Sequence, residues 1–147
     1  MNSVFYYLWR FILALTGWLV SVIVAACIMA VLLPFGNREL ANLTAMEKIS
    51  STGLEGFQAL IFYVGVSTFI PALWVIVWAE STARRGWLFH SFTGLLVGMY
   101  VVSFGLFMHM QSGPWSYPFI TAAIAVAGIV AGSIYWLIAG RSAGRRR

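Results

Sequence analysis

The stretch from Gly86 to Gly140 reads GWLFHSFTGLLVGMYVVSFGLFMHMQSGPWSYPFITAAIAVAGIVAGSIYWLIAG and contains no Asp, Glu, Lys or Arg. A bilayer core about 30 Å thick is crossed by roughly 20 helical residues, so this stretch is long enough for two spans and a turn. Residues with turn chemistry occur near its middle, at Gln111–Pro114 (QSGP). The pattern predicts a helical hairpin with spans over about 87–108 and 118–139.

Two further runs without charged residues precede the hairpin, over about 11–33 and 57–79, and each is long enough to cross a bilayer. The chain is 61% hydrophobic and 9% charged, which is typical of integral membrane proteins rather than soluble domains. We therefore expect residues 1–147 to form a single integral membrane domain, an all-α protein with four transmembrane helices. Its polar parts are an outer loop over 34–56 and a basic tail over 140–147.

The outer loop carries signals for helix ends. Residues 34–36 (PFG) are expected to end the first span. Thr44-x-x-Glu47 and Thr52-x-x-Glu55 both match the capping box, in which paired side chains satisfy free backbone donors at a helix start. An apolar side chain also recurs every third residue, which predicts a short helix lying on the membrane surface. This apolar stripe consists of Leu40, Leu43, Met46 and Ile49.

The first apolar run contains a sequence, Val24–Cys27 (VAAC), that fits a bacterial lipoprotein cleavage site. A cleavable apolar region is about 7–15 residues long, and a lipoprotein normally turns polar after its cysteine. Here IMAVLL follows the cysteine and continues the run to spanning length. We therefore interpret 11–33 as a span that is kept and Cys27 as a small apolar side chain within it.

The placement of arginine predicts the orientation in the membrane. Two of the nine basic residues, Arg38 and Lys48, fall in the outer loop, beside three glutamates. The other seven lie at the opposite ends of the spans: Arg10, Arg84, Arg85, Arg141, Arg145, Arg146 and Arg147. Because loops rich in Lys and Arg stay in the cytoplasm, we expect both termini there, in a bacterial inner membrane. The arginines at these ends are expected to orient the chain and contact lipid headgroups, so nucleic acid is not an expected partner.

Charged residues inside spans usually mark transport paths, because burying them in lipid is costly, and the four predicted spans contain none. In its four short spans the chain resembles the small multidrug exporters. That family carries a membrane-embedded glutamate in its first span, and residues 11–33 contain no glutamate. The resemblance therefore does not extend to proton-coupled export.

The two histidines, His90 and His109, are 19 residues apart (109 minus 90) on one predicted helix. That separation corresponds to about 28 Å along the helix axis, so they cannot bind one haem between them. We interpret both as polar residues at opposite membrane interfaces. Since the sequence also contains no nucleophile–base pair, zinc-ligand spacing or phosphate-binding loop, we expect neither an enzyme nor a bound cofactor.

Small residues recur at helical spacing on both arms of the hairpin, in Gly94-x-x-x-Gly98 and Gly128-x-x-x-Gly132. Glycines four residues apart lie on one helix face and let two backbones approach closely. These helix-packing candidates can clamp the two arms together or contact another membrane protein. The sequence leaves both alternatives open.

Two other positions are candidates for function. Pro71 is expected to kink the second span, because proline removes a helical hydrogen bond. Met108, His109 and Met110 combine soft thioethers with an imidazole, which suits Cu(I). Successive helical residues point about 100° apart, so these three converge on one ion only at an unwound helix end, and we expect no bound metal.

These observations favour a non-enzymatic integral membrane protein that acts through helix contacts, as an accessory or assembly subunit of a membrane complex. The expected partners are the lipid bilayer and other membrane helices, including further copies of this chain. The alternative hypothesis is a small oligomeric transporter or channel that uses Pro71 as its flexible point. A third is Cu(I) handling at the outer face.

Overall fold

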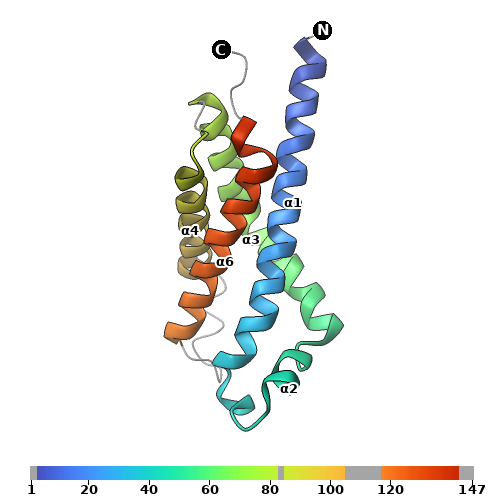
Figure 1. Cartoon of the computed structure of the whole chain (residues 1–147), viewed down its shortest axis with the longest axis vertical. Helices are drawn as coiled ribbons and strands as arrows, with labels where there is room; N and C mark the ends of the chain where they lie inside the picture. The colour runs from blue at the N-terminus through green and yellow to red at the C-terminus, as the bar shows by residue number, and fades with distance from the viewer. Residues whose placement is uncertain (1–2, 83–84, 105–116, 143–147) are drawn as a thin grey trace.

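The computed structural model describes residues 3–82, 85–104 and 117–142. Most of these residues are helical and none lies in a β-strand, so the predicted all-α class is confirmed. The helices are α1 (Ser3–Gly36), α2 (Ala45–Ser50), α3 (Gly53–Ser81), α4 (Trp87–Phe104) and α6 (Tyr117–Ile138), with short 3₁₀ turns η1 (Arg38–Leu40) and η2 (Gly140–Ser142) (Figure 1).

Three of the helices are long and apolar enough to cross a membrane: α1 over Tyr7–Gly36, α3 over Gly53–Ala79 and α6 over Pro118–Ile138. This finding supports a membrane protein. A shorter apolar helix covers Trp87–Ser103 in α4. The end of the predicted third span and the turn at Gln111–Pro114 lie outside the described residues.

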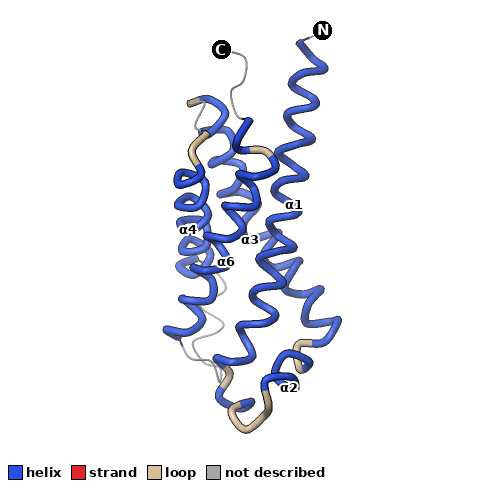
Figure 2. Tube along the Cα trace, in the orientation of Figure 1, coloured by secondary structure: helices blue, strands red, loops and turns tan. Residues whose placement is uncertain are grey.

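The helices form an elongated bundle (Figure 2). The start of α1, the passage from α3 to α4 and the turn η2 lie at one end, and α2 lies at the other (Figure 1). The arms α4 and α6 pack against each other, and α1 packs along α6. The arrangement places segments 17–33 and 120–139 side by side although they are far apart in sequence.

The buried core is built from α1, α4 and α6. Its members are Ala25, Met29 and Leu33 from α1, Val102 from α4, and Ile120, Ala123, Ile124 and Ala127 from α6. The helix α3 flanks this core. In the most apolar stretch of each helix, 44% of residues are buried in α1 and 28% in α6, but 0% in α3. The fold is therefore a tight three-helix unit with a loosely packed fourth helix.

The first helix ends within residues 34–36, as the sequence predicts, but it does not stop at the proline. The helix α1 continues through Pro34 and ends at Gly36. A proline in a helix leaves the carbonyl four residues earlier without its usual donor, and here that carbonyl belongs to Ala30. The Thr52 hydroxyl donates to it at 3.1 Å. The helix tolerates Pro34 because a side chain next to the start of α3 replaces the missing N–H.

The loop between α1 and α3 contains one confirmed capping box. The backbone N–H of Thr44 donates to the Glu47 carboxylate at 2.8 Å, and the Glu47 N–H donates back to the Thr44 hydroxyl at 3.4 Å. The Thr44 hydroxyl also donates to that carboxylate, at 2.8 Å. The bonds that the backbone N–H and the hydroxyl of Thr44 donate to the carboxylate lower the pKa of Glu47 below its ordinary value of 4.5. The two residues of the apolar stripe that lie on α2 are exposed, Met46 at 77% and Ile49 at 40%, which fits a helix lying on a membrane surface.

Candidate functional sites in the helix bundle

The predicted glycines meet one another at the crossing of α4 and α6. A Cβ atom on Gly94 would collide with the carbonyl oxygen of Gly128 and lie 2.9 Å from the Cα of Gly132. A Cβ on Gly128 would lie 2.5 Å from the Gly94 oxygen, and one on Gly98 would lie 3.1 Å from the oxygen of Ile124. The two backbones are thus in direct contact. Of the two alternatives that the sequence leaves open, the structure shows packing within the chain.

Hydrogen bonds add to this contact near the start of α4. The Trp87 indole donates to the Ser133 hydroxyl at 3.1 Å, and the Ser91 and Ser133 hydroxyls share a bond of 2.9 Å. The Trp136 indole donates to the backbone oxygen of Arg85 at 2.7 Å. The connector before α4 is therefore fastened to the end of α6 by aromatic side chains as well as by the glycines.

A second close contact, between α1 and α6, was not predicted from the sequence. The Ser21 hydroxyl lies 2.8 Å from the oxygen of Gly17 and 2.9 Å from the oxygen of Ala131, and Ser21 is only 8% exposed. A Cβ on Gly17 would lie 3.2 Å from the ring of Tyr135. The signal was present as Gly17-x-x-x-Ser21-x-x-x-Ala25, a row of small residues on one helix face.

His90 is buried inside the helix bundle, with only 1% of its surface exposed. The imidazole packs against Phe89, with ring centroids 5.1 Å apart, and against Tyr135 at 5.6 Å. A Cβ on Gly140 would lie 2.7 Å from its Nε2 atom. The imidazole fits inside the bundle because its neighbour at the beginning of η2 is Gly140, which has no side chain.

Pro71 lies inside α3, which is assigned as one continuous helix from Gly53 to Ser81. One turn earlier the Thr68 hydroxyl donates to the oxygen of Val64 at 2.6 Å. Pro71 also lines a groove of about 370 Å³ between α3 and α4, together with Ile70, Val75, Val97 and three large side chains. Those three are Trp74, Leu96 and Tyr100.

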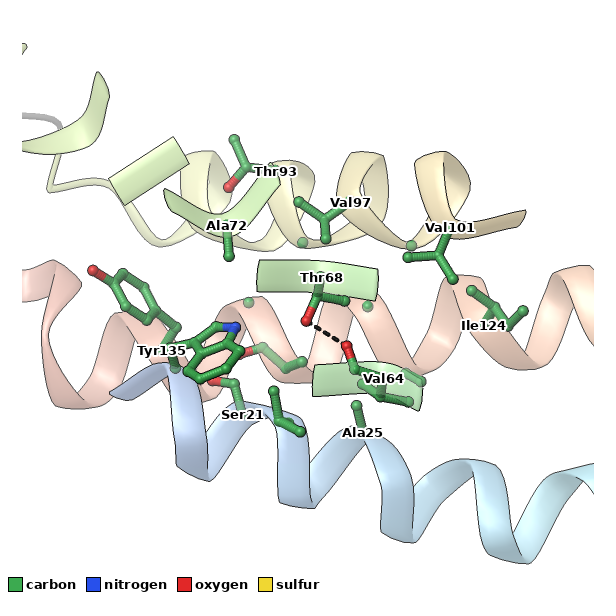
Figure 3. Close-up of a pocket in the computed structure, with 18 of the residues that line it drawn as sticks. Ser21, Ala25, Val64, Thr68, Ala72, Thr93, Val97, Val101, Ile124 and Tyr135 are labelled. Carbon is green, nitrogen blue, oxygen red and sulfur yellow. Dashed lines mark hydrogen bonds between the residues drawn. The ribbon is translucent and has the colours of Figure 1, made fainter. Parts of the chain in front are cut away.

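All four long helices line a second space, a partly open cavity of about 140 Å³. Figure 3 shows side chains from each helix around it: Ser21 and Ala25 from α1, Thr68 and Ala72 from α3, Thr93 and Val97 from α4, and Ile124 and Tyr135 from α6. The wall contains no Asp, Glu, Lys or Arg and is largely aliphatic. Its chemistry suits a neutral, apolar occupant rather than an ion.

Other predicted site residues lie apart from this cavity or outside the description. Arg85 and Arg141 are exposed. Cys27 is exposed on α1 rather than packed in the core. Arg84, Arg145, Arg146, Arg147, Met108, His109 and Met110 lie outside the described residues. Within the part that the structure describes, no group of three His, Cys, Asp or Glu side chains is placed to hold a metal ion.

Comparisons with protein-family models, curated proteins and solved structures find no match to this chain.

Proposed function

We propose that this chain is a non-enzymatic integral membrane protein that acts through helix contacts, as an accessory or assembly subunit of a membrane complex. In this proposal four helices cross a bacterial inner membrane and both termini lie in the cytoplasm. The orientation is supported by the seven arginines on one side of the predicted spans against two basic residues on the other. The glycines of the hairpin are already used within the chain, so the contact surface must lie elsewhere.

The observation that carries the proposal is the loose attachment of α3. Its most apolar stretch has no buried residue, whereas α1 and α6 are packed into the core. Trp74 is the most exposed of its large side chains, at 75%. A helix so weakly held by its own chain has its packing surface available to a neighbour.

The indole N–H of Trp74 also favours a contact with a partner helix. Trp74 lies six residues from Thr68, the middle of the predicted span 57–79, which is about 9 Å along the axis. Among the residues that the structure describes, no acceptor for its indole N–H is found. A donor without an acceptor is costly in hydrocarbon. A polar side chain on a partner helix can supply the acceptor.

Co-purification in a mild detergent tests this proposal. We expect a partner at fixed stoichiometry with the wild-type chain and a weaker association for Trp74→Ala. The matched control is Ile23→Ala, since Ile23 is an exposed apolar residue of α1, at 46%. Recovery of monomer alone from wild-type membranes would contradict the proposal.

A small oligomeric transporter or channel is the second candidate, and the groove beside Pro71 favours it. This groove lies between α3 and α4, and α3 contacts α4 much less than it contacts α1. Movement of α3 about Pro71 would then change access along the groove. Flux in proteoliposomes is the test: transport that is absent, or that Pro71→Ala leaves unchanged, argues against this function.

A further inference from the structure

We propose that the cavity between the four helices binds a neutral molecule dissolved in the membrane. The molecule has an apolar body about the size of a benzene ring and carries one hydrogen-bond acceptor, such as a carbonyl oxygen. This site is separate from the contact surface on α3 and does not depend on it. Its evidence is the size of the cavity, the hydrogen bonds along its wall, and its depth.

The size of the cavity follows from the small residues that bring the helices together. Gly94 and Gly98 on α4 and Gly128 on α6 line it with backbone atoms alone. Ala72 faces it from α3 (Figure 3). The resulting volume is about 140 Å³. An apolar cavity of about 150 Å³ in a protein core stays dry and takes up benzene, so this space matches a single ring.

Three of the hydroxyl groups on the wall already donate to backbone oxygens of the chain. Ser21 donates within α1 or to Ala131 on α6, and Thr68 donates to Val64. Thr93 donates to the oxygen of His90 at 3.0 Å. These three side chains therefore offer a ligand acceptors but no spare proton.

Trp18 differs from these hydroxyls. It lines the cavity, and its Nε1 atom is shielded from solvent without an acceptor among the described residues. An unsatisfied buried donor costs stability and calls for an explanation. A ligand carbonyl that reaches this N–H removes the cost. The cavity wall therefore favours a ligand that is apolar except for one hydrogen-bond acceptor.

Access to the indole N–H of Trp18 depends on the loosely packed helix α3. The Trp18 ring meets Phe69 of α3 edge to face, with centroids 5.4 Å apart. Because α3 is the least packed helix, a small outward shift uncovers the indole N–H and opens the cavity towards the lipid. The ligand therefore arrives through the bilayer rather than from water.

Depth distinguishes the ligand from a phospholipid. Trp18 is four residues from Val22, the middle of the predicted span 11–33, which is about 6 Å along the axis. Half of a hydrocarbon core is about 15 Å thick, so the ester groups of a lipid stay well outside this level. An acyl chain reaches the cavity but brings no acceptor. A small carbonyl compound dissolved in the bilayer can reach the depth of Trp18 and also supplies the hydrogen-bond acceptor.

The test compares two probes of nearly equal shape, 4-fluoroacetophenone and 4-fluoro-α-methylstyrene, in which a CH₂ group replaces the carbonyl oxygen. Binding to the full chain in lipid nanodiscs is followed by ¹⁹F NMR, with empty nanodiscs subtracted. We expect saturable binding of the ketone, tighter than the alkene by about two- to tenfold, the ratio that one neutral hydrogen bond gives.

Two variants locate the site, and circular dichroism verifies that each is folded. Trp18→Phe should remove the preference for the ketone, and Trp74→Phe, which changes a residue that does not line the cavity, should keep it. Ala72→Leu should abolish saturable binding by filling the cavity. Equal affinity of the wild-type chain for both probes would overturn the proposal without reference to any variant. It would also be overturned by native mass spectrometry showing a retained phospholipid in place of either probe.

Discussion

Replacing Gly94 with alanine should separate the two arms of the hairpin. The new Cβ would collide with the carbonyl oxygen of Gly128 and lie 2.9 Å from the Cα of Gly132. Both obstacles are backbone atoms, so no side-chain rotation relieves them. Overpacking of this kind typically costs about 1–3 kcal/mol, and we expect Gly94→Ala to fall in the upper half of that range.

The matched control is Gly65→Ala on α3. A Cβ there would lie 3.7 Å from a Val22 methyl carbon, which is ordinary van der Waals contact. Alanine is the better helix former by about 0.5–1 kcal/mol, so this variant should be unchanged or slightly more stable. The assay is unfolding by SDS in mixed micelles, monitored by circular dichroism.

A double variant sharpens the test. Gly94→Ala and Gly128→Ala act on the same contact, because each Cβ would strike the other glycine's carbonyl oxygen. Once the first substitution has separated the helices, the second should cost little, so the pair should be less destabilising than the sum. The reasoning would be refuted if Gly94→Ala were as stable as Gly65→Ala, or if the two glycine substitutions were additive.

Three further predictions concern single hydrogen bonds. Ser21→Ala removes the hydrogen bond between α1 and α6 and should lower the free energy of unfolding by about 0.6–1.7 kcal/mol in the same SDS titration. The control is Ser103→Ala, which should cost less because the Ser103 hydroxyl donates to Met99 of its own helix. Thr52→Val leaves the Ala30 oxygen without its donor; hydrogen exchange should then rise at the end of α1 and not after Ser51→Ala. The capping of α2 depends on ionised Glu47, whose pKa is lowered in the folded chain, so its contribution is complete above the ordinary value of 4.5 and is lost as the pH falls through the lowered pKa. The α2 amides should lose protection over that acidic range, and Glu47→Gln should remove the pH dependence.

The all-helical class and the close approach of the hairpin arms could be predicted from the sequence. Long runs without charge set the helices, and glycines four residues apart mark a face that permits backbone contact. Their meeting at Gly94 and Gly128 is a local consequence of the hairpin. The contact of α1 with α6 was harder to foresee, because Ser21 finds its acceptor in Ala131, 110 residues further along the chain.

Other features depend on neighbours that a periodic pattern does not reveal. His90 is buried because Gly140 lies over its ring, and nothing near His90 in the sequence indicates this. The helix α1 passes Pro34 because Thr52 supplies a donor from a different helix. The loose packing of α3 is equally invisible, since its sequence is as apolar as that of the buried helices.

Photo-crosslinking in native membranes tests most directly whether α3 is a contact surface for another membrane protein. A benzophenone side chain is placed at position 74 of α3 or, for comparison, at position 23 of α1, both of which are exposed. A partner that assembles on α3 should give one discrete adduct from position 74, of a single identified protein, and none from position 23. Lipid adducts alone from position 74, or the same products from both positions, would contradict the proposed function.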